Sequence, residues 1–295
     1  MKSYPRVLTI AGSDSGGGAG IQADIKAISA TGSYAASAIT AVTVQNTLGV
    51  EAVHPVPTDI ISAQISCVLS DIGADAIKIG MLHSAEVVLA VRDALLQAEK
   101  GLRGISPVFC PESPSLQPAA ATFSIVLDPV MVATSGHRLI EESAIKVLSD
   151  KLMPLARVIT PNIPEAEILV GHQITRQQDL PSVARELSSK VSRTSPVSVL
   201  MKAGHLTDDR LVDVFYNAED DHIVELPSAR LYTPNTHGTG CTLSSAFASF
   251  LAQGMTLDDA ARAATGYIHE AIAAGADYQI GRGHGPVDHF YKLHK

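Results

Sequence analysis

The segment Asn235-Thr236-His237-Gly238-Thr239-Gly240-Cys241-Thr242 joins a strand-like run to a long alanine-rich stretch with helical periodicity. The first four N–H groups of a helix have no partner within the helix, and the helix dipole places positive charge at the same end. The segment therefore predicts an anion site, suited to a phosphate or to a developing oxyanion. A second interpretation has equal weight here: the glycines only permit a turn, and Thr239 or Thr242 caps the helix.

A second glycine-rich segment, residues 12–20 (GSDSGGGAG), directly follows the strand-like run 6–11. Two anion-friendly loops in one chain indicate a site with two ends. Neither loop matches a common nucleotide-binding pattern, since Ile21 stands where the dinucleotide pattern needs a third glycine and Gly18 where a Walker loop needs lysine. Leu243 likewise replaces the third glycine after Gly240. These departures argue against a dehydrogenase and a P-loop enzyme.

Composition narrows the class of protein further. The chain has 295 residues, 46% of them hydrophobic, which is enough for a large core in one α/β domain. The formal net charge is −8 and no basic stripe is present, which argues against a nucleic-acid partner. The three cysteines, Cys67, Cys110 and Cys241, lack C-x-x-C spacing and favour a reducing compartment over disulfides or structural zinc.

The N-terminal apolar run ends at Gly12, which is too short for a signal peptide or a membrane span. We therefore expect a soluble, cytoplasmic protein with no membrane partner.

Short apolar runs alternate with helix-period segments along the chain. Strands are predicted at 6–11, 35–44, 76–79, 125–127, 157–160 and 197–201, a hairpin at 211–216 and 222–226, and helices at 21–30, 58–69, 84–98, 141–151, 242–252 and 257–273. This order predicts a mostly parallel sheet with helices on both faces. Residues 101–122, with four prolines, read as an exposed insertion in a single domain spanning 1–295.

Polar residues stand where the predicted strands end: Ser13, Asp14, Gln45, Asn46, Asp128, Asn162 and Lys202. In such folds ligands bind beyond the carboxyl ends of the strands, so these positions favour one shared crevice. Alone, each has an ordinary alternative: Asp128 before proline starts a turn, Asn162 caps a helix, and Lys202 snorkels from a strand end. Asp24, one turn into a helix, is explained by the helix dipole without any function.

Cys241 and the C-terminal histidines are further candidates. A thiol at a helix start beside glycines should have a lowered pKa and suits a nucleophile, with His237 as the nearest base. We prefer a pocket-lining role for Cys241, because the surrounding residues suit phosphates rather than acyl groups. His284, His289 and His294 recur every five residues, which is poor spacing for ligands on one helical face, and they read as a solvated tail.

Seven stretches together resemble the hydroxymethylpyrimidine/phosphomethylpyrimidine kinases of thiamine biosynthesis, in the ribokinase-like superfamily. They are residues 9–24 (TIAGSDSGGGAGIQAD), 44–47 (VQNT), 78–82 (KIGML), 128–131 (DPVM), 160–166 (TPNIPEA), 201–205 (MKAGH) and 235–242 (NTHGTGCT). The resemblance runs nearly end to end and implies a three-layer αβα fold. It also implies a homodimer. Ala203 replaces a glycine usual in the family, and residues 101–122 are extra sequence.

The resemblance implies ATP-dependent phosphorylation of 4-amino-5-hydroxymethyl-2-methylpyrimidine and then of its monophosphate. On the substrate side it implies roles for Gln45, Asp24, Met81, Gly12 and Cys241. On the ATP side it implies Lys202, Gly204 and Asn162, with Asp128 and Glu165 around Mg²⁺; it leaves a monovalent cation open. Gly238, Thr239, Gly240 and Cys241 would form the catalytic anion hole. Many relatives carry an aspartate base where this chain has Cys241, so the proton acceptor stays open.

Two alternatives compete with this interpretation. A pyridoxal or pyridoxine kinase of the same superfamily phosphorylates a similar hydroxymethyl ring, and Gln45 favours the aminopyrimidine because an amide both accepts and donates. A non-catalytic pyrimidine-binding regulator on the same fold is the other class, since fold does not fix function. The set Asp128, Asn162, Glu165 and Gly238–Cys241 argues against it.

Overall fold

A computed structural model describes residues 4–104, 123–132, 139–206 and 210–294. Within these residues, nine strands form one sheet in the order β3-β2-β1-β4-β5-β6-β7-β8-β9. The strands are β1 (Arg6–Ser13), β2 (Tyr34–Asn46), β3 (Gly49–Pro55), β4 (Ala76–Ile79), β5 (Ser124–Leu127), β6 (Val158–Ile159), β7 (Ser198–Met201), β8 (Arg210–Asn217) and β9 (His222–Ala229). Neighbours from β2 to β7 are parallel, and β3, β8 and β9 join antiparallel.

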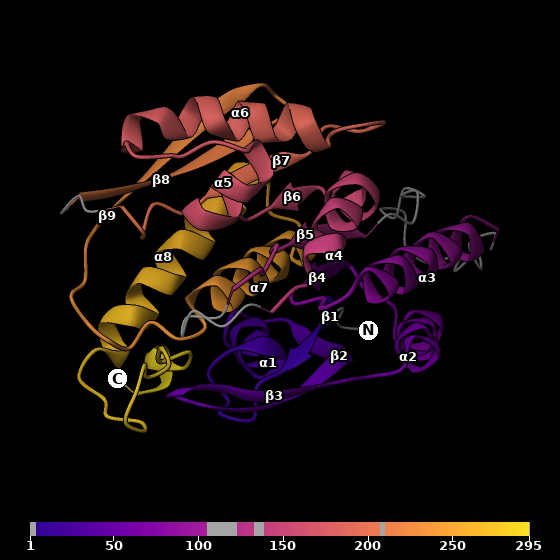
Figure 1. The fold of residues 1–295 in the computed structure, drawn as a ribbon, viewed down its shortest axis with the longest axis horizontal. Helices are drawn as coiled ribbons and strands as arrows, with labels where there is room; N and C mark the ends of the chain where they lie inside the picture. The colour runs from indigo at the N-terminus through magenta and orange to yellow at the C-terminus, as the bar shows by residue number, and fades with distance from the viewer. Residues whose placement is uncertain (1–3, 105–122, 133–138, 207–209, 295) are drawn as a thin grey trace, which may run out of the picture.

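Helices cover both faces of this sheet (Figure 1). One apolar cluster packs the sheet against α2 (Thr58–Asp71), α3 (Ala85–Gly104), α4 (Glu142–Val147), α5 (Ile163–Val170) and α6 (Leu180–Val191). The other packs it against α1 (Gly20–Ala30), α7 (Thr239–Ala252) and α8 (Leu257–Gly275). Successive residues of β1 alternate between the clusters, with Val7 in one and Leu8 in the other. The three-layer αβα prediction is confirmed.

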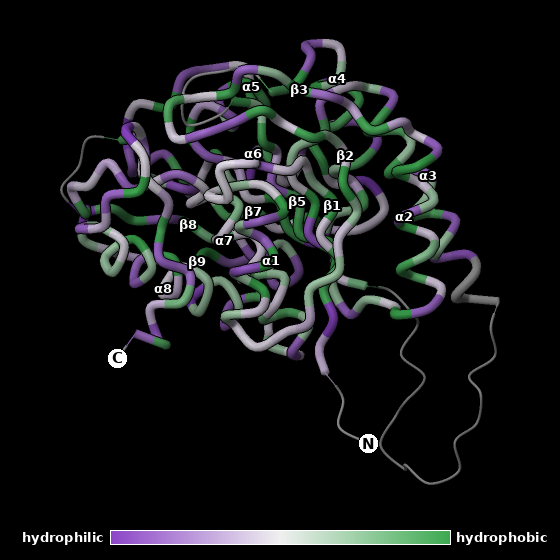
Figure 2. The backbone as a smooth tube through the Cα atoms, turned by 90° about the horizontal axis from the view of Figure 1, so that it is seen from below, coloured by the Kyte–Doolittle hydropathy of each residue, from purple (hydrophilic) through white to green (hydrophobic). Residues whose placement is uncertain are grey.

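Apolar segments gather at the centre of the molecule, around β1 and β5 (Figure 2). Both strands are buried on their two faces, which explains why their sequences are nearly continuous apolar runs. In the described part of the chain, no helix is long and apolar enough to cross a membrane. The fold is thus organised around a buried parallel sheet, with its polar loops at the strand ends.

The structure differs from the predicted elements in several places. Helix α6 was not predicted, and α5 was expected only as a helix start at Asn162. Strand β3 was not predicted, because only Val50 of this edge strand is buried and its pattern is weak. Helix α4 ends at Val147 and continues as a π-helical segment, Leu148–Leu152, rather than as one α-helix. Residues 101–104 belong to α3 instead of the predicted insertion, whose remainder, 105–122, lies outside the described residues.

His289 is not part of a solvated tail, which corrects the prediction for it. Its side chain is 4% exposed, and Nε2 lies 2.9 Å from Thr242 Oγ1 on α7. The Tyr267 hydroxyl donates to the His289 carbonyl at 2.8 Å. Burial, assisted by the charge of Lys26, lowers the pKa of His289 to about 4. The C-terminal segment is therefore packed against α7 and α8 through a neutral histidine.

This buried histidine predicts a loss of stability in acid. An unfolded histidine takes up a proton near pH 6.5, whereas folded His289 does so only near pH 4. The stability that neutral His289 contributes is fully present above pH 6.5 and is lost as the pH falls from there toward pH 4. Between pH 7.5 and pH 5, the wild type should lose about 2 kcal/mol more unfolding free energy than His289→Gln, measured in urea. The exposed His284→Gln is the control, and equal losses in all three proteins would contradict the assignment.

Candidate active site

One cavity of about 640 Å³ opens at the carboxyl ends of the parallel strands. This volume is typical of small-molecule sites. Of the site residues predicted from the sequence, all but Asp24 line it: Gly12, Gln45, Met81, Asp128, Asn162, Glu165, Lys202, Gly204, Gly238, Thr239, Gly240 and Cys241. The shared crevice expected from strand-end polarity is present, and of the polar strand-end residues all but Asn46 line it.

The two glycine-rich loops meet at the edge of this cavity. Gly238 has a φ of +80°, and a side-chain carbon added there would lie 1.8 Å from the Gly18 carbonyl oxygen. His237 Nε2 lies 2.8 Å from Asp14 Oδ2, which ties the second loop to the first. Segments more than 200 residues apart in sequence thus form one structure, as the paired glycine clusters predicted.

Helix α7 begins at the second loop and points its N-terminus into the cavity. Gly238 is the residue before the helix, and its carbonyl accepts from Thr242 N at 2.9 Å. In the described part of the chain, the N–H groups of Gly240 and Cys241 have no backbone acceptor. A carbon added to Gly240 would lie 3.2 Å from both Asp128 Oδ2 and Lys202 Nζ. This end of the cavity therefore offers backbone donors beside a cation, an arrangement that binds anions.

Lys202 and Asp128 form an ion pair at that end. Lys202 Nζ donates to Asp128 Oδ1 at 2.9 Å, and Thr160 Oγ1 donates to the same oxygen at 2.9 Å. Burial would lower the pKa of Lys202, but the carboxylates of Asp128 and Glu165 outweigh it and raise the pKa. Lys202 therefore carries a positive charge toward the cavity.

Asn162 and Glu165 form a reciprocal cap at the start of α5. Asn162 Oδ1 accepts from Glu165 N, and Glu165 Oε2 accepts from Asn162 N, both at 2.9 Å. The capping alternative weighed for Asn162 is thus correct, and both side chains also line the cavity. Burial and the charge of Asp128 raise the pKa of Glu165 to about 7, against the opposing effect of Lys202.

The two carboxylates beside Lys202 fit a divalent cation that is shared with a ligand. The described residues contain no group of three or more metal-ligating side chains. Mg²⁺ characteristically uses one or two carboxylates and completes its shell with water and substrate phosphates. Asp128 and Glu165, both buried and both lining the cavity, satisfy that requirement.

Cys241 corrects one expectation. Burial raises the pKa of its thiol to about 11, because the charge of Lys78 does not compensate for the lost solvent. The lowered pKa predicted from the helix start is therefore wrong. The thiol remains protonated near neutral pH, which supports the pocket-lining interpretation over a nucleophile.

Asp24 lies beneath the cavity rather than on its wall, so its side-chain position does not support a substrate contact. Its carboxylate accepts from Lys78 Nζ at 2.8 and 2.9 Å, and both side chains are fully buried. Thr9 Oγ1 and Ser245 Oγ donate to it at 2.6 and 2.8 Å. The pair joins β1, α1, β4 and α7 under the anion-binding end.

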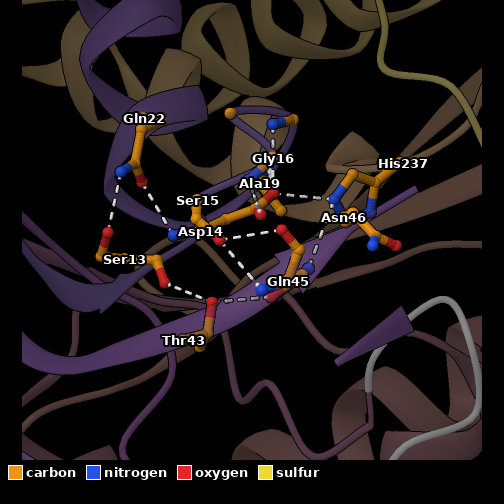
Figure 3. Close-up of polar contacts among 12 residues, drawn as sticks. Ser13, Asp14, Ser15, Gly16, Ala19, Gln22, Thr43, Gln45, Asn46 and His237 are labelled. Carbon is orange, nitrogen blue, oxygen red and sulfur yellow. Dashed lines mark hydrogen bonds and ion pairs between the residues drawn. The ribbon is translucent and has the colours of Figure 1, made fainter. Parts of the chain in front are cut away.

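Gln45 also lines the cavity, and Figure 3 shows its polar neighbours. Its backbone is fixed by Ser15, whose hydroxyl donates to Gln45 O at 2.8 Å and accepts from Gln45 N at 2.9 Å. Thr43 and His237 flank its side-chain amide. Met81 packs over Gly12, where an added carbon would meet the sulfur at 3.4 Å. This part of the cavity wall offers an amide and an apolar side chain to a flat, polar ring.

Sequence reasoning missed two charged residues. Asp213 lines the cavity from β8, accepts from Ala203 N at 2.7 Å, and has its pKa raised by burial to about 6. A single aspartate in an edge hairpin gives no sequence signal. Lys78 did give a sequence signal, because it is the lone charged residue in the apolar strand β4.

Three comparisons with known proteins bear on this site. The sequence profile of the family described as phosphomethylpyrimidine kinase matches residues 14–118 and 115–288. A hydroxymethylpyrimidine/phosphomethylpyrimidine kinase of Rhizobium meliloti is 44% identical over 288 residues, covering 98% of each chain. The structure of a Clostridium difficile phosphomethylpyrimidine kinase has a TM-score of 0.69 at 39% identity, covering 90% of this chain and 99% of the other. An ADP complex of Bacillus subtilis pyridoxal kinase has a TM-score of 0.80 at 31% identity, covering 99% of both.

Proposed function

This chain belongs to the phosphomethylpyrimidine kinase family, and we infer that it phosphorylates 4-amino-5-hydroxymethyl-2-methylpyrimidine with ATP, and then the monophosphate, in thiamine biosynthesis. One observation carries this proposal: a single cavity is lined both by the anion-binding helix start beside Lys202 and by the side-chain amide of Gln45. The family is a kinase family, so the regulator alternative loses its support.

We assign the nucleotide to the end that carries Lys202, Gly204 and Asn162. The charge of Lys202 suits the phosphates, and Asp128 and Glu165 would hold Mg²⁺ there. When bound, Mg²⁺ would neutralise phosphate charge during transfer. A monovalent cation remains compatible with this arrangement.

Transfer forms a bond between the hydroxymethyl oxygen and the γ-phosphorus, breaks the bond from that phosphorus to the bridging oxygen of ADP, and releases the hydroxyl proton. Because the transition state is loose, positioning and charge stabilisation matter more than a strong base. The N–H groups from Gly238 to Cys241 would donate to the oxygens of the moving phosphoryl group. Gln45 and Met81 would hold the ring so that its hydroxymethyl group faces these N–H groups.

A coupled assay of ADP release with ATP, Mg²⁺ and the hydroxymethylpyrimidine tests this function. Robust turnover with the pyrimidine is expected. Pyridoxal in the same assay tests the alternative supported by the likeness to pyridoxal kinase, and turnover of pyridoxal alone would overturn the pyrimidine assignment.

Gln45→Ala should reduce kcat/KM for the pyrimidine about 100-fold, because a partly buried polar contact with the ring is lost. The KM for ATP should stay within about twofold of wild type, since Gln45 has Ser15, Thr43 and His237 as its polar partners, and we assign none of them to the nucleotide. Steady-state kinetics with each substrate varied measure both. The neighbouring exposed residue provides the control, Asn46→Ala, and equal kinetics in the two variants would contradict the assigned role.

We also propose a homodimer of single-domain chains in the cytoplasm. Val42 and Val44 on the outer side of β2 are 46% and 54% exposed, on alternate positions to Thr43 and Gln45. Such apolar exposure suits a second copy. Val44→Lys should convert a dimer to a monomer in sedimentation, and an unchanged mass would contradict this surface. Free Cys67 and Cys241 suit a reducing compartment.

A further inference from the structure

Asp14 is surrounded by hydrogen-bond donors. Its carboxylate accepts from Gly16 N at 2.8 Å, Gly18 N at 3.1 Å and Ala19 N at 2.8 Å. His237 Nε2 lies 2.8 Å from Oδ2 of the same carboxylate. Burial alone would raise the pKa of Asp14, but these contacts outweigh it and lower the pKa. Asp14 is therefore ionised and can only accept.

The ionised carboxylate decides which nitrogen of His237 carries a proton. Nε2 must hold a hydrogen that points at Asp14, because two lone pairs at 2.8 Å would repel. That nitrogen then has no lone pair for Gln45, whose Nε2 lies 3.4 Å away. As the amide is placed, one donor faces another donor.

Thr43 creates the matching conflict at the other end of the amide. Its hydroxyl has one hydrogen and two acceptors within reach, Ser13 O at 2.7 Å and Gln45 Oε1 at 3.1 Å (Figure 3). The Ser13 carbonyl has no hydrogen to give and is nearer, so it takes the Thr43 hydrogen. The Thr43 lone pairs are left facing the Gln45 oxygen, an acceptor toward an acceptor.

A half turn of the Gln45 amide about its last side-chain bond removes both conflicts. The amide nitrogen then donates to Thr43 Oγ1, and the amide oxygen lies beside the N–H group of His237, whose hydrogen stays directed at Asp14, so that a donor no longer faces a donor. The main chain does not need to move, because Ser15 holds Gln45 N and O independently. Oxygen and nitrogen of an amide are nearly equal in shape, so hydrogen bonding selects between the two orientations.

We propose that Thr43 and His237, the latter fixed by Asp14, are specificity-determining positioning residues that set the orientation of the Gln45 amide. This inference rests on the proposed function. With one amide hydrogen and one oxygen lone pair still available, the pocket presents a donor on the Thr43 side and an acceptor on the His237 side. The ring edge that fits has its acceptor toward Thr43 and its donor toward His237.

An aminopyrimidine edge meets this requirement, because its exocyclic amine donates and the adjacent ring nitrogen accepts. The corresponding 4-oxo ring carries a carbonyl and a ring N–H, so donor and acceptor are exchanged. Binding that ring would require turning the amide back against both neighbours. The wild type should therefore prefer the 4-amino compound over its 4-oxo analogue by roughly 100-fold in kcat/KM.

The test compares this preference in wild type, His237→Phe, Thr43→Val and Thr43→Ser. His237→Phe and Thr43→Val should lower it to about tenfold or less, because the amide can then turn freely. Thr43→Ser keeps the hydroxyl and should therefore keep the preference for the 4-amino compound near its wild-type value. Damage to folding or to the anion loop would slow both compounds together and leave the ratio unchanged, so an unchanged ratio in both variants would overturn the proposal.

A structure of the wild type with the aminopyrimidine gives a second test that needs no variant. The exocyclic amine should lie nearer His237 than Thr43, and the reverse placement would overturn the inference. The proposed function fails separately, if wild type does not phosphorylate the 4-amino compound at all. If wild type turns over this compound and the variants have an unchanged ratio, the proposed function stands and only the positioning role is refuted.

Discussion

Gly238→Ala is expected to lower kcat by about 100- to 1,000-fold, with the folded structure retained. The added carbon would lie 1.8 Å from the Gly18 carbonyl oxygen and 3.2 Å from Ala19 Cα, so backbone, and not a flexible side chain, must give way. Relief of that clash displaces the N–H groups at the start of α7 relative to Lys202. Catalysis by preorganised donors is sensitive to displacements of this size.

Gly254 provides a matched control for this change. It also has a left-handed backbone, with φ of +86°, and no atom lies within 4 Å of an added carbon. Gly254→Ala should therefore pay the conformational cost of about 1–2 kcal/mol without affecting kcat. Saturating kinetics and urea unfolding of both variants separate the two effects. If the kcat values of the two variants agree within about threefold, the loop has no catalytic role.

Asp24→Ala is expected to reduce the free energy of unfolding by about 3–5 kcal/mol. The change leaves the Lys78 ammonium fully buried without its carboxylate and removes the acceptor for Thr9 and Ser245. An uncompensated buried charge costs far more than the pair contributes when intact. Urea unfolding at pH 7 measures the loss.

The double variant Asp24→Leu with Lys78→Met should recover most of that loss, because two apolar side chains need no counter-charge. Asp75→Ala breaks the half-exposed pair with Arg6 and is the comparison, expected to cost about 1 kcal/mol after solvent screening. A loss in Asp24→Ala no greater than that of Asp75→Ala would show that the buried pair is dispensable.

The αβα fold and most strand-end residues were predictable because local patterns determine them. A buried parallel strand is an apolar run, and the first polar residue after it, as with Asp128 or Lys202, stands at the ligand-binding edge. The meeting of the two loops was expected from the pair of glycine clusters, although the strand before the second loop, β9, ends at Ala229 and lies six places from β1 in the sheet.

Properties that depend on distant partners were not predictable. Asp24 finds Lys78 across 54 residues, and this contact removes it from the cavity wall. The raised pKa of Cys241 comes from burial, which a helix start does not reveal. His289 occurs in a polar tail sequence, yet tertiary packing against Thr242 buries it.

The junction between Asp14 and His237 has a consequence for the synthesis of this protein. These partners are separated by 223 positions, so neither half of the pocket can be completed by the chain that precedes residue 237. A growing polypeptide on the ribosome therefore stays inactive until nearly its full length has emerged. Two fragments divided between the loops should likewise be inert apart and regain turnover only on reassociation.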